Sequence, residues 1–267
     1  MKKWRVKPGH KLKLKHVDPG ATPGISKEEA AEKTPGLLNA LDLWQERLYA
    51  ESKRSLLIVL QAIDTGGKDG TIRHVMHGAN PQSCRVSSFK VPSTWERAHD
   101  FLWRVHKEVP PKGFIGIFNR SHYEDVMVTR VHGTLSDEEA ERRFGQIKDF
   151  ERHLSQNGVT ILKFFLHISK EEQRKRLEAR LANPDKRWKF SLDDLKERKY
   201  WNRYQEVFQE AISATSTKHA PWYVIPANHK WYRNWIVARI VVKTLKDMNP
   251  KYPPTDPRIV PGKIHIR

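Results

Sequence analysis

One stretch near residue 60 constrains the fold more than any other. An apolar run over residues 55–61 leads into a turn that holds Gly66, Gly67 and Lys68, and an amphipathic segment begins at Thr71. A short apolar run bounded by turn residues predicts a buried strand, and apolar residues at helical spacing predict a helix. Glycines let several backbone N–H groups point at one anion, while the helix N-terminus and the lysine add positive charge. The stretch therefore predicts a phosphate-binding turn between a strand and a helix.

This turn departs from the usual G-x-x-x-x-G-K-[ST] pattern at two positions. Ala62 replaces the first glycine, and Asp69 replaces the Ser or Thr after the lysine. A Gly-Gly-Lys sequence by itself also occurs in ordinary loops, but its place between a strand and a helix favours phosphate binding. We assign the following residues to the cradle: Gly66, Gly67, Lys68, Asp69, Gly70 and Thr71. Asp69 also stands where a carboxylate would cap the helix.

Strands and helices alternate along the chain. The patterns predict strands at 55–61, 84–89, 114–118, 160–167 and 222–226, and helices at 37–52, 69–77, 94–107, 137–156, 169–182, 192–214 and 230–247. This alternation predicts an α/β fold, with a mainly parallel sheet of about five strands flanked by helices. Ligands of such sheets bind beyond the carboxyl ends of the strands, where the glycine turn falls.

The two ends of the chain differ from its middle. We expect a basic N-terminal arm over residues 1–35, a single domain over 36–249, and a proline-rich, extended tail over 250–267. The 267 residues are enough for one large core. Cys84 is the single cysteine, which excludes an intrachain disulfide. The absence of a secretory signal or a bilayer-spanning apolar run favours a cytoplasmic protein with no membrane partner.

Polar residues follow the strand predicted at 114–118. Arg120 suits phosphate binding because its planar guanidinium donates two parallel hydrogen bonds and keeps its charge. Glu124 or Asp125 is a candidate ligand of Mg²⁺, which prefers oxygen donors. Asp64, inside the glycine turn, is a candidate metal ligand or base toward an attacking oxygen. The alternatives are a surface turn with a local ion pair for the first group, and an Asx-turn for Asp64.

A third, basic segment follows the strand predicted at 160–167. Arg176 and Arg180 are one helical turn apart, and a loop with three further cations comes after the helix: Lys186, Arg187 and Lys189. Such a loop can close over phosphates and exclude water. The alternative is a solvated, charged helix. Aromatic residues at helical spacing in 200–204 and 231–235 favour core packing over contact with a nucleobase.

The net charge is the outstanding bulk property. A formal charge of +18 and a pI near 9.9 favour an anionic partner, which includes nucleic acid, a membrane surface and a polyphosphorylated substrate. No recognisable nucleic-acid-binding motif is present, so we expect no nucleic-acid partner.

Three motifs in this order resemble the polyphosphate kinase 2 family. They are the segments 64–70, 118–125 and 180–189, and the similarity runs over roughly residues 35–250. The resemblance implies a P-loop kinase fold like that of thymidylate kinases, with a helical lid at about 176–195. It also implies transfer of the terminal phosphoryl group of inorganic polyphosphate to AMP and/or ADP, giving ADP and ATP, with Mg²⁺ as cofactor. A homodimer or homotetramer is expected by the same similarity.

The resemblance also assigns roles to residues. Catalytic roles fall to Asp64, Lys68, Arg120, Asp125 and Arg180, with Asp64 and Asp125 as metal ligands. Further nucleotide or phosphate contacts are implied for Asn119, Ser121, Tyr123 and Glu124, and lid cations for Arg176, Lys186, Arg187 and Lys189. With Asp69 directly after the lysine, the sequence resembles the subgroup of the family that acts on both AMP and ADP.

Phosphoryl transfer depends mainly on alignment and cationic stabilisation, so we expect direct in-line attack by a nucleotide phosphate oxygen without a phospho-enzyme. Two other functions remain as alternatives: an ATP-dependent nucleoside monophosphate kinase, and a non-catalytic nucleic-acid-binding protein.

Overall fold

A five-stranded sheet lies at the centre of the molecule. The computed structural model describes residues 2–259 and 263. The strands follow the order β2-β3-β1-β4-β5, and each neighbouring pair is parallel. Their bounds are β1 Ser55–Gln61, β2 Cys84–Ser88, β3 Ile115–Asn119, β4 Val159–His167 and β5 Trp222–Pro226. The predicted α/β class and all the predicted strands are confirmed.

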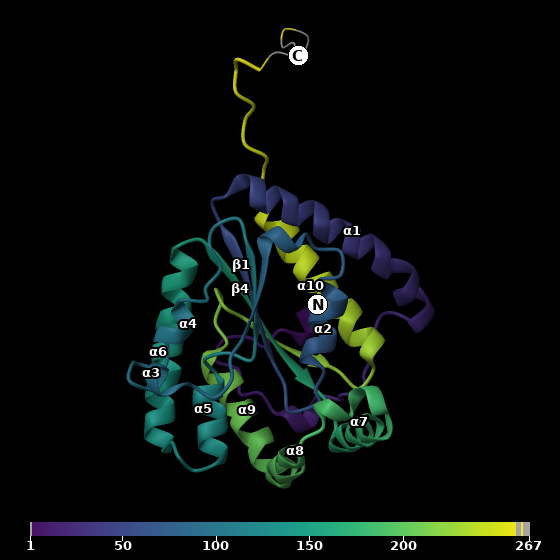
Figure 1. Cartoon of the computed structure of the whole chain (residues 1–267), viewed down its shortest axis with the longest axis vertical. Helices are drawn as coiled ribbons and strands as arrows, with labels where there is room; N and C mark the ends of the chain where they lie inside the picture. Colours follow the sequence, from purple (N-terminus) through teal and green to yellow (C-terminus); the bar gives the residue numbers. More distant parts are fainter. Residues whose placement is uncertain (1, 260–262, 264–267) are drawn as a thin grey trace.

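Helices cover both faces of the sheet (Figure 1). One face carries α1 Lys27–Glu51, α2 Lys68–Val75 and α10 Lys230–Met248, and the other carries α5 Glu124–Val131, α6 Asp137–Gln156 and α9 Trp201–Thr215. The short helix α3 Thr94–Arg97 precedes α4 Trp103–His106, which lies beside α6, while α7 Lys170–Ala182 and α8 Leu192–Glu197 lie beyond the ends of the strands. This arrangement leaves the carboxyl edge of the sheet as the place where loops from several strands meet.

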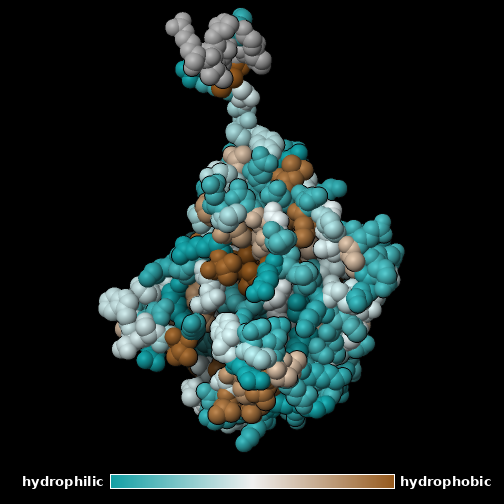
Figure 2. Space-filling model, turned by 45° about the vertical axis from the view of Figure 1, so that its right-hand side comes forward, coloured by the Kyte–Doolittle hydropathy of each residue, from teal (hydrophilic) through white to brown (hydrophobic). Residues whose placement is uncertain are grey.

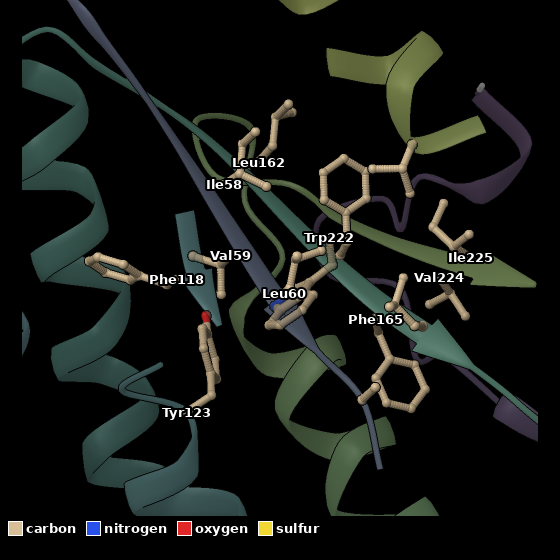
Figure 3. Packing of buried hydrophobic residues seen from close by; sticks show 14 of the residues in the cluster. Ile58, Val59, Leu60, Phe118, Tyr123, Leu162, Phe165, Trp222, Val224 and Ile225 are labelled. Carbon is tan, nitrogen blue, oxygen red and sulfur yellow. The ribbon is translucent and has the colours of Figure 1, made fainter. Parts of the chain in front are cut away.

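The core sits on both sides of β1, whose residues are all buried. The strand pairs with β3 on one side and β4 on the other, so it has no free edge. Figure 3 shows Phe118 and Tyr123 on the side of α5 and α6, and Phe165 and Trp222 extending from β4 and β5. The ring of Trp222 packs on that of Tyr123, with centroids 4.9 Å apart. A strand buried on both faces reads as a continuous apolar run, which is why β1 was recognisable in the sequence.

The helix predictions failed in four places. The first helix begins at Lys27, ten residues before the predicted 37, since Ser26 and Glu29 form a capping box and Pro35 is tolerated inside the helix. The helix predicted at 94–107 is divided into α3 and α4, and Asp100 Oδ1 accepts a hydrogen bond from Leu102 N in the turn between them. The helix predicted at 192–214 is divided into α8 and α9, and α5 was missed.

The N-terminal arm contributes to the core. Trp4, Val6, Leu12 and Leu14 are buried, and Val6 N donates to Trp222 O at 2.9 Å, beside β5. Of the aromatic residues expected to pack in the core, Trp201, Tyr204, Tyr232 and Trp235 are buried, whereas Tyr200 is 45% exposed. Residues 260–262 and 264–267 of the predicted tail lie outside the described residues. The division into arm, domain and tail stays a prediction.

The face in Figure 2 is mostly hydrophilic, with small, separate apolar patches. None of the helices in the described part of the chain combines the length and apolar character needed to cross a membrane.

Candidate active site

The glycine-rich turn follows β1 at the carboxyl edge of the sheet. Thr65 and Gly67 have positive φ angles of 61° and 101°, and Gly67 is the N-cap of α2. A Cβ on Gly66 would lie 2.4 Å from Ala62 Cβ, so that position has no room for a side chain. These two positions explain the glycines: Gly66 needs space, and Gly67 needs a backbone conformation that side chains disfavour. The turn presents the first N–H groups of α2 as an anion site.

Lys68 lies inside this turn. Its Nζ donates to Ala62 O at 2.9 Å, which holds the ammonium group across the loop. Burial lowers the pKa of Lys68, and the nearby Asp64 carboxylate counteracts that shift. A desolvated ammonium group interacts strongly with an anion that enters the same space.

Helix α7 fixes the outside of the turn. Arg176 Nη1 donates to Thr65 O at 3.0 Å and to Gly66 O at 3.1 Å, and Gln173 Nε2 donates to Asp64 O at 3.1 Å. Arg176 Nη2 donates to Ala227 O, and Nε pairs with Glu172 at 2.7 Å. The guanidinium group is therefore committed to protein partners. Arg176 was predicted to be a lid cation, but its bonds make it a support of the turn.

Arg120 joins the ends of two neighbouring strands. It follows β3, has a positive φ of 66°, and pairs with Asp64 Oδ1 at 3.1 Å and with Glu124 Oε2 at 3.6 Å. Burial raises the pKa of Glu124, while Arg120 and Lys68 counteract part of the shift. Two cations and two carboxylates thus meet around the glycine turn: Lys68, Arg120, Asp64 and Glu124.

The structure decides between the two acids of the second motif. Asp125 points away from this group and pairs with Arg104 at 2.9 Å, where both side chains are largely buried. The sequence left Glu124 and Asp125 as alternative acidic partners of Arg120, and Glu124 is the one that pairs with it, since successive positions at the start of α5 face different directions. The predicted roles of Asp125 in catalysis and metal binding lose their geometric support, and Glu124 occupies the place instead.

Three predicted ligand contacts are internal to the protein. Ser121 is fully buried, with its Oγ 3.1 Å from Gln61 Nε2, and Thr71 Oγ1 donates to Gly67 O at 3.0 Å. Tyr123 is also fully buried, and its hydroxyl donates to Glu151 and accepts from Lys163, both at 2.9 Å. Their polar atoms are used to hold the loop and α5, so burial argues against direct contact with a substrate.

The lid residues reach the turn through Lys189. The segment predicted to be the lid runs from α7 through the 3-10 helix Pro184–Lys189 into α8. Lys189 Nζ lies 3.4 Å from Asp69 Oδ2, and Asn119 Nδ2 donates to Asp69 Oδ1 at 2.9 Å. Burial raises the pKa of Asp69, but these two partners outweigh it and leave the pKa lowered. Asp69 therefore connects α2, β3 and the lid.

The remaining lid cations have different surroundings. Arg180 Nη1 donates to Lys189 O at 2.9 Å and lies 3.3 Å from Asp194 Oδ2. Arg187 donates to Leu181 O, and Lys186 is exposed. Lys189 therefore contacts Asp69 of the cradle directly, and Arg180 contacts Lys189. Lys186 and Arg187 are exposed to solvent.

Sequence reasoning missed two residues of this region. Asp194 of α8 lies near Asp64 and Arg120. Its pKa is raised, mainly by burial and secondly by the negative charge of Asp64. Arg233 of α10 is buried beside Gly67, where a Cβ would lie 1.9 Å from its Nη1. Arg233 lies on the same face of α10 as the buried apolar residues Ile236, Val237 and Ile240. An arginine at a core position was therefore the feature of the sequence that could have identified it as a site residue.

Known proteins match the chain along most of its length. The family model described as polyphosphate kinase 2 matches residues 24–253. An AMP/ADP-polyphosphate phosphotransferase of Meiothermus ruber is 54% identical over 268 residues and covers 100% of both chains. An ADP-polyphosphate phosphotransferase of Rhodopseudomonas palustris is 42% identical, covering 96% of this chain and 93% of the relative.

A solved structure agrees with the fold. The crystal structure of polyphosphate kinase 2 from Arthrobacter aurescens TC1 superimposes with a TM-score of 0.91 at 43% identity, covering 95% of this chain and 91% of that one. This similarity confirms the predicted P-loop kinase architecture. Together with the family match, it establishes that the chain belongs to the polyphosphate kinase 2 family.

Proposed function

We propose that this protein transfers the terminal phosphoryl group of inorganic polyphosphate to AMP and to ADP, forming ADP and ATP. The observation that carries the proposal is the convergence of Lys68 and Arg120 with Asp64 at the glycine turn, in a chain 54% identical to a relative named for this activity. The formal charge of +18 supports a polyanionic donor, since every unit of polyphosphate carries negative charge.

The protein contributes position and charge. The N–H groups of the turn and Lys68 hold the transferring phosphoryl group, and Arg120 neutralises the negative charge on its oxygens. A nucleotide phosphate oxygen attacks phosphorus in line with the bond to the rest of the polyphosphate chain. That bond breaks, and the shortened chain leaves with the bonding electron pair. No phospho-enzyme forms in this scheme, so a search for phosphohistidine during turnover tests it.

Magnesium is the proposed cofactor. In the described part of the chain, no three carboxylate, imidazole or thiol groups are arranged to hold a metal ion alone. This fits Mg²⁺, which is commonly bound by one or two carboxylates together with substrate phosphates and water. Asp64, whose side chain is 29% exposed beside the cradle, would hold it. Bound there, the ion would neutralise phosphate charge.

One assay separates this function from its alternatives. Purified protein is incubated with polyphosphate, Mg²⁺ and AMP, ADP, GMP or GDP, and products are separated by chromatography; a parallel arm offers ATP and AMP without polyphosphate. We expect phosphorylation of AMP and ADP in the polyphosphate arm. Transfer only from ATP would instead identify an ATP-dependent monophosphate kinase, and salt-sensitive nucleic-acid binding without turnover would identify a binding protein.

Two further assignments belong to the proposal. We place the protein in the cytoplasm and expect a homodimer or homotetramer by family similarity. Light scattering of the purified protein measures the oligomeric state.

A further inference from the structure

Arg233 is a buried cation without an acidic partner. It is 3% exposed, and its Nε and Nη2 donate only to Asn234 Oδ1, at 3.1 and 2.8 Å. Within residues 2–259 and 263, no carboxylate pairs with it, and its Nη1 has no hydrogen-bond acceptor. An unpaired buried charge is unfavourable, and a group of this kind gains most from an anionic ligand.

The guanidinium group lies against the phosphate-binding turn. A Cβ on Gly67 would come within 1.9 Å of Arg233 Nη1, and one on Gly70 within 3.3 Å of Nη2. Arg233 therefore runs along the first turn of α2, where the N–H groups of the helix are free to bind an anion. Burial and the neighbouring Arg176 lower the pKa of Arg233 to about 10, which leaves it charged at neutral pH.

Arg233 and Arg176 differ in what they can still bind. Arg176 has an ion pair with Glu172 and hydrogen bonds to backbone carbonyls, so it supports the turn. Arg233 retains an unused donor at the same turn. One arginine shapes the site and the other is available to a ligand.

The sheet order indicates which substrate Arg233 faces. A cavity of about 420 Å³ lies along β2 and the residues that follow it, with a lining that includes Ser88, Lys90 and Arg104. Because β2 and β3 are neighbours, this cavity lies on the side of Arg120 and of α4, whereas α2 and α10 pack on each other on the opposite face of the sheet. In-line transfer requires donor and acceptor on opposite sides of the transferring group. An acceptor nucleotide near β2 leaves the α10 side to the donor.

We propose that Arg233 binds the polyphosphate donor, at a phosphoryl unit adjacent to the one held by the glycine turn. This inference rests on the proposed function. Arg233 would contact the part of the polyphosphate chain that leaves in the reaction. The acceptor AMP would make no contact with Arg233.

The test compares Arg233→Ala and Arg233→Lys with Arg239→Ala. Arg239 is an exposed arginine on the same helix, stacked on Trp235, and its removal changes the net charge by the same amount. Initial rates are measured against polyphosphate at saturating AMP, and against AMP at saturating polyphosphate. Binding of polyphosphate alone is measured by calorimetry at several KCl concentrations, and melting temperatures are recorded.

We expect Arg233→Ala to raise the KM and Kd for polyphosphate at least tenfold, with the KM for AMP changed less than twofold. The dependence of log Kd on log[KCl] should become shallower by about one. Arg233→Lys should restore part of the affinity, Arg239→Ala should behave as wild type, and the melting temperature of Arg233→Ala should not fall.

Three results would overturn the inference: an unchanged Kd for polyphosphate in both Arg233 variants, an equal rise in the KM for AMP, or a loss of affinity matched by Arg239→Ala. A wild-type protein that neither binds nor uses polyphosphate would instead refute the proposed function.

Discussion

Arg120 Nη2 lies 3.1 Å from Asp64 Oδ1, so the residue after β3 is bonded to the turn after β1. Backbone hydrogen bonding supports this contact, since Arg120 N donates to Leu60 O at 3.1 Å. The pair places a carboxylate beside Arg120 and near Lys68, and makes Asp64 the first residue to test.

Asp64→Asn should lower kcat by about 100-fold and raise the Mg²⁺ concentration needed for half-maximal rate. The amide keeps the shape and can still accept from Arg120, but it loses the negative charge that a metal ion requires. Steady-state rates across a Mg²⁺ titration measure this. Asp193→Asn on the exposed face of α8 serves as the control; a similar loss in both variants would contradict a specific role for Asp64.

Lys68→Ala should reduce kcat by about 100- to 1,000-fold while leaving the fold intact, because it removes a positive charge from the turn where we propose that the transferring phosphoryl group binds. Rate measurements are paired with circular dichroism. Lys112→Ala, at an exposed position, should retain full activity. An unchanged rate in the Lys68 variant would remove the site assignment.

Gly67→Ala should abolish activity, whereas Gly133→Ala should not. Both glycines have positive φ, 101° and 68°, so alanine costs about 1–2 kcal/mol of backbone strain at either position. Only at Gly67 does the new Cβ collide with Arg233, since nothing lies within 4 Å at Gly133. Urea unfolding and rate assays of both variants separate strain from the collision; equal activities would argue against this geometry.

Lys163→Met should destabilise the protein by about 3–5 kcal/mol. Lys163 Nζ is buried and pairs with Glu151 Oε2 at 2.6 Å, so its removal leaves a buried carboxylate without a cation. Urea unfolding measures the loss. The double variant Lys163→Met/Glu151→Gln should recover part of it, and a double variant no more stable than the single one would count against the ion pair.

His167 should make the protein less stable in mild acid. Burial lowers its pKa from 6.5 to about 4, so between these values the unfolded chain binds more protons than the folded one. Stability from this group is therefore complete above pH 6.5 and decreases as the pH falls toward 4. Between pH 7 and 5, the free energy of unfolding of the wild type should fall by about 2 kcal/mol more than that of His167→Gln. Parallel pH dependences would exclude His167 as the cause.

Local patterns predicted the elements of this protein. The apolar run of β1, the glycine turn and the alternation of strands and helices are properties of neighbouring residues, so they were readable without a structure. The same holds for Lys68, because its position between strand and helix is a matter of spacing. One helix start was predicted wrongly: residues 1–35 were expected to form an arm, yet the capping box at Ser26 begins α1 within that stretch, and Pro35 lies inside the helix.

Only the tertiary structure decided which side chains share the site. Glu124 rather than Asp125 faces Arg120, Arg176 supports the turn through carbonyl bonds, and Arg233 arrives from a helix near the end of the chain. These facts depend on how separate elements pack and which rotations they adopt. The sequence determined the glycine turn and the sheet, while the packing of α5, α7 and α10 around that turn determined the partners of its charges.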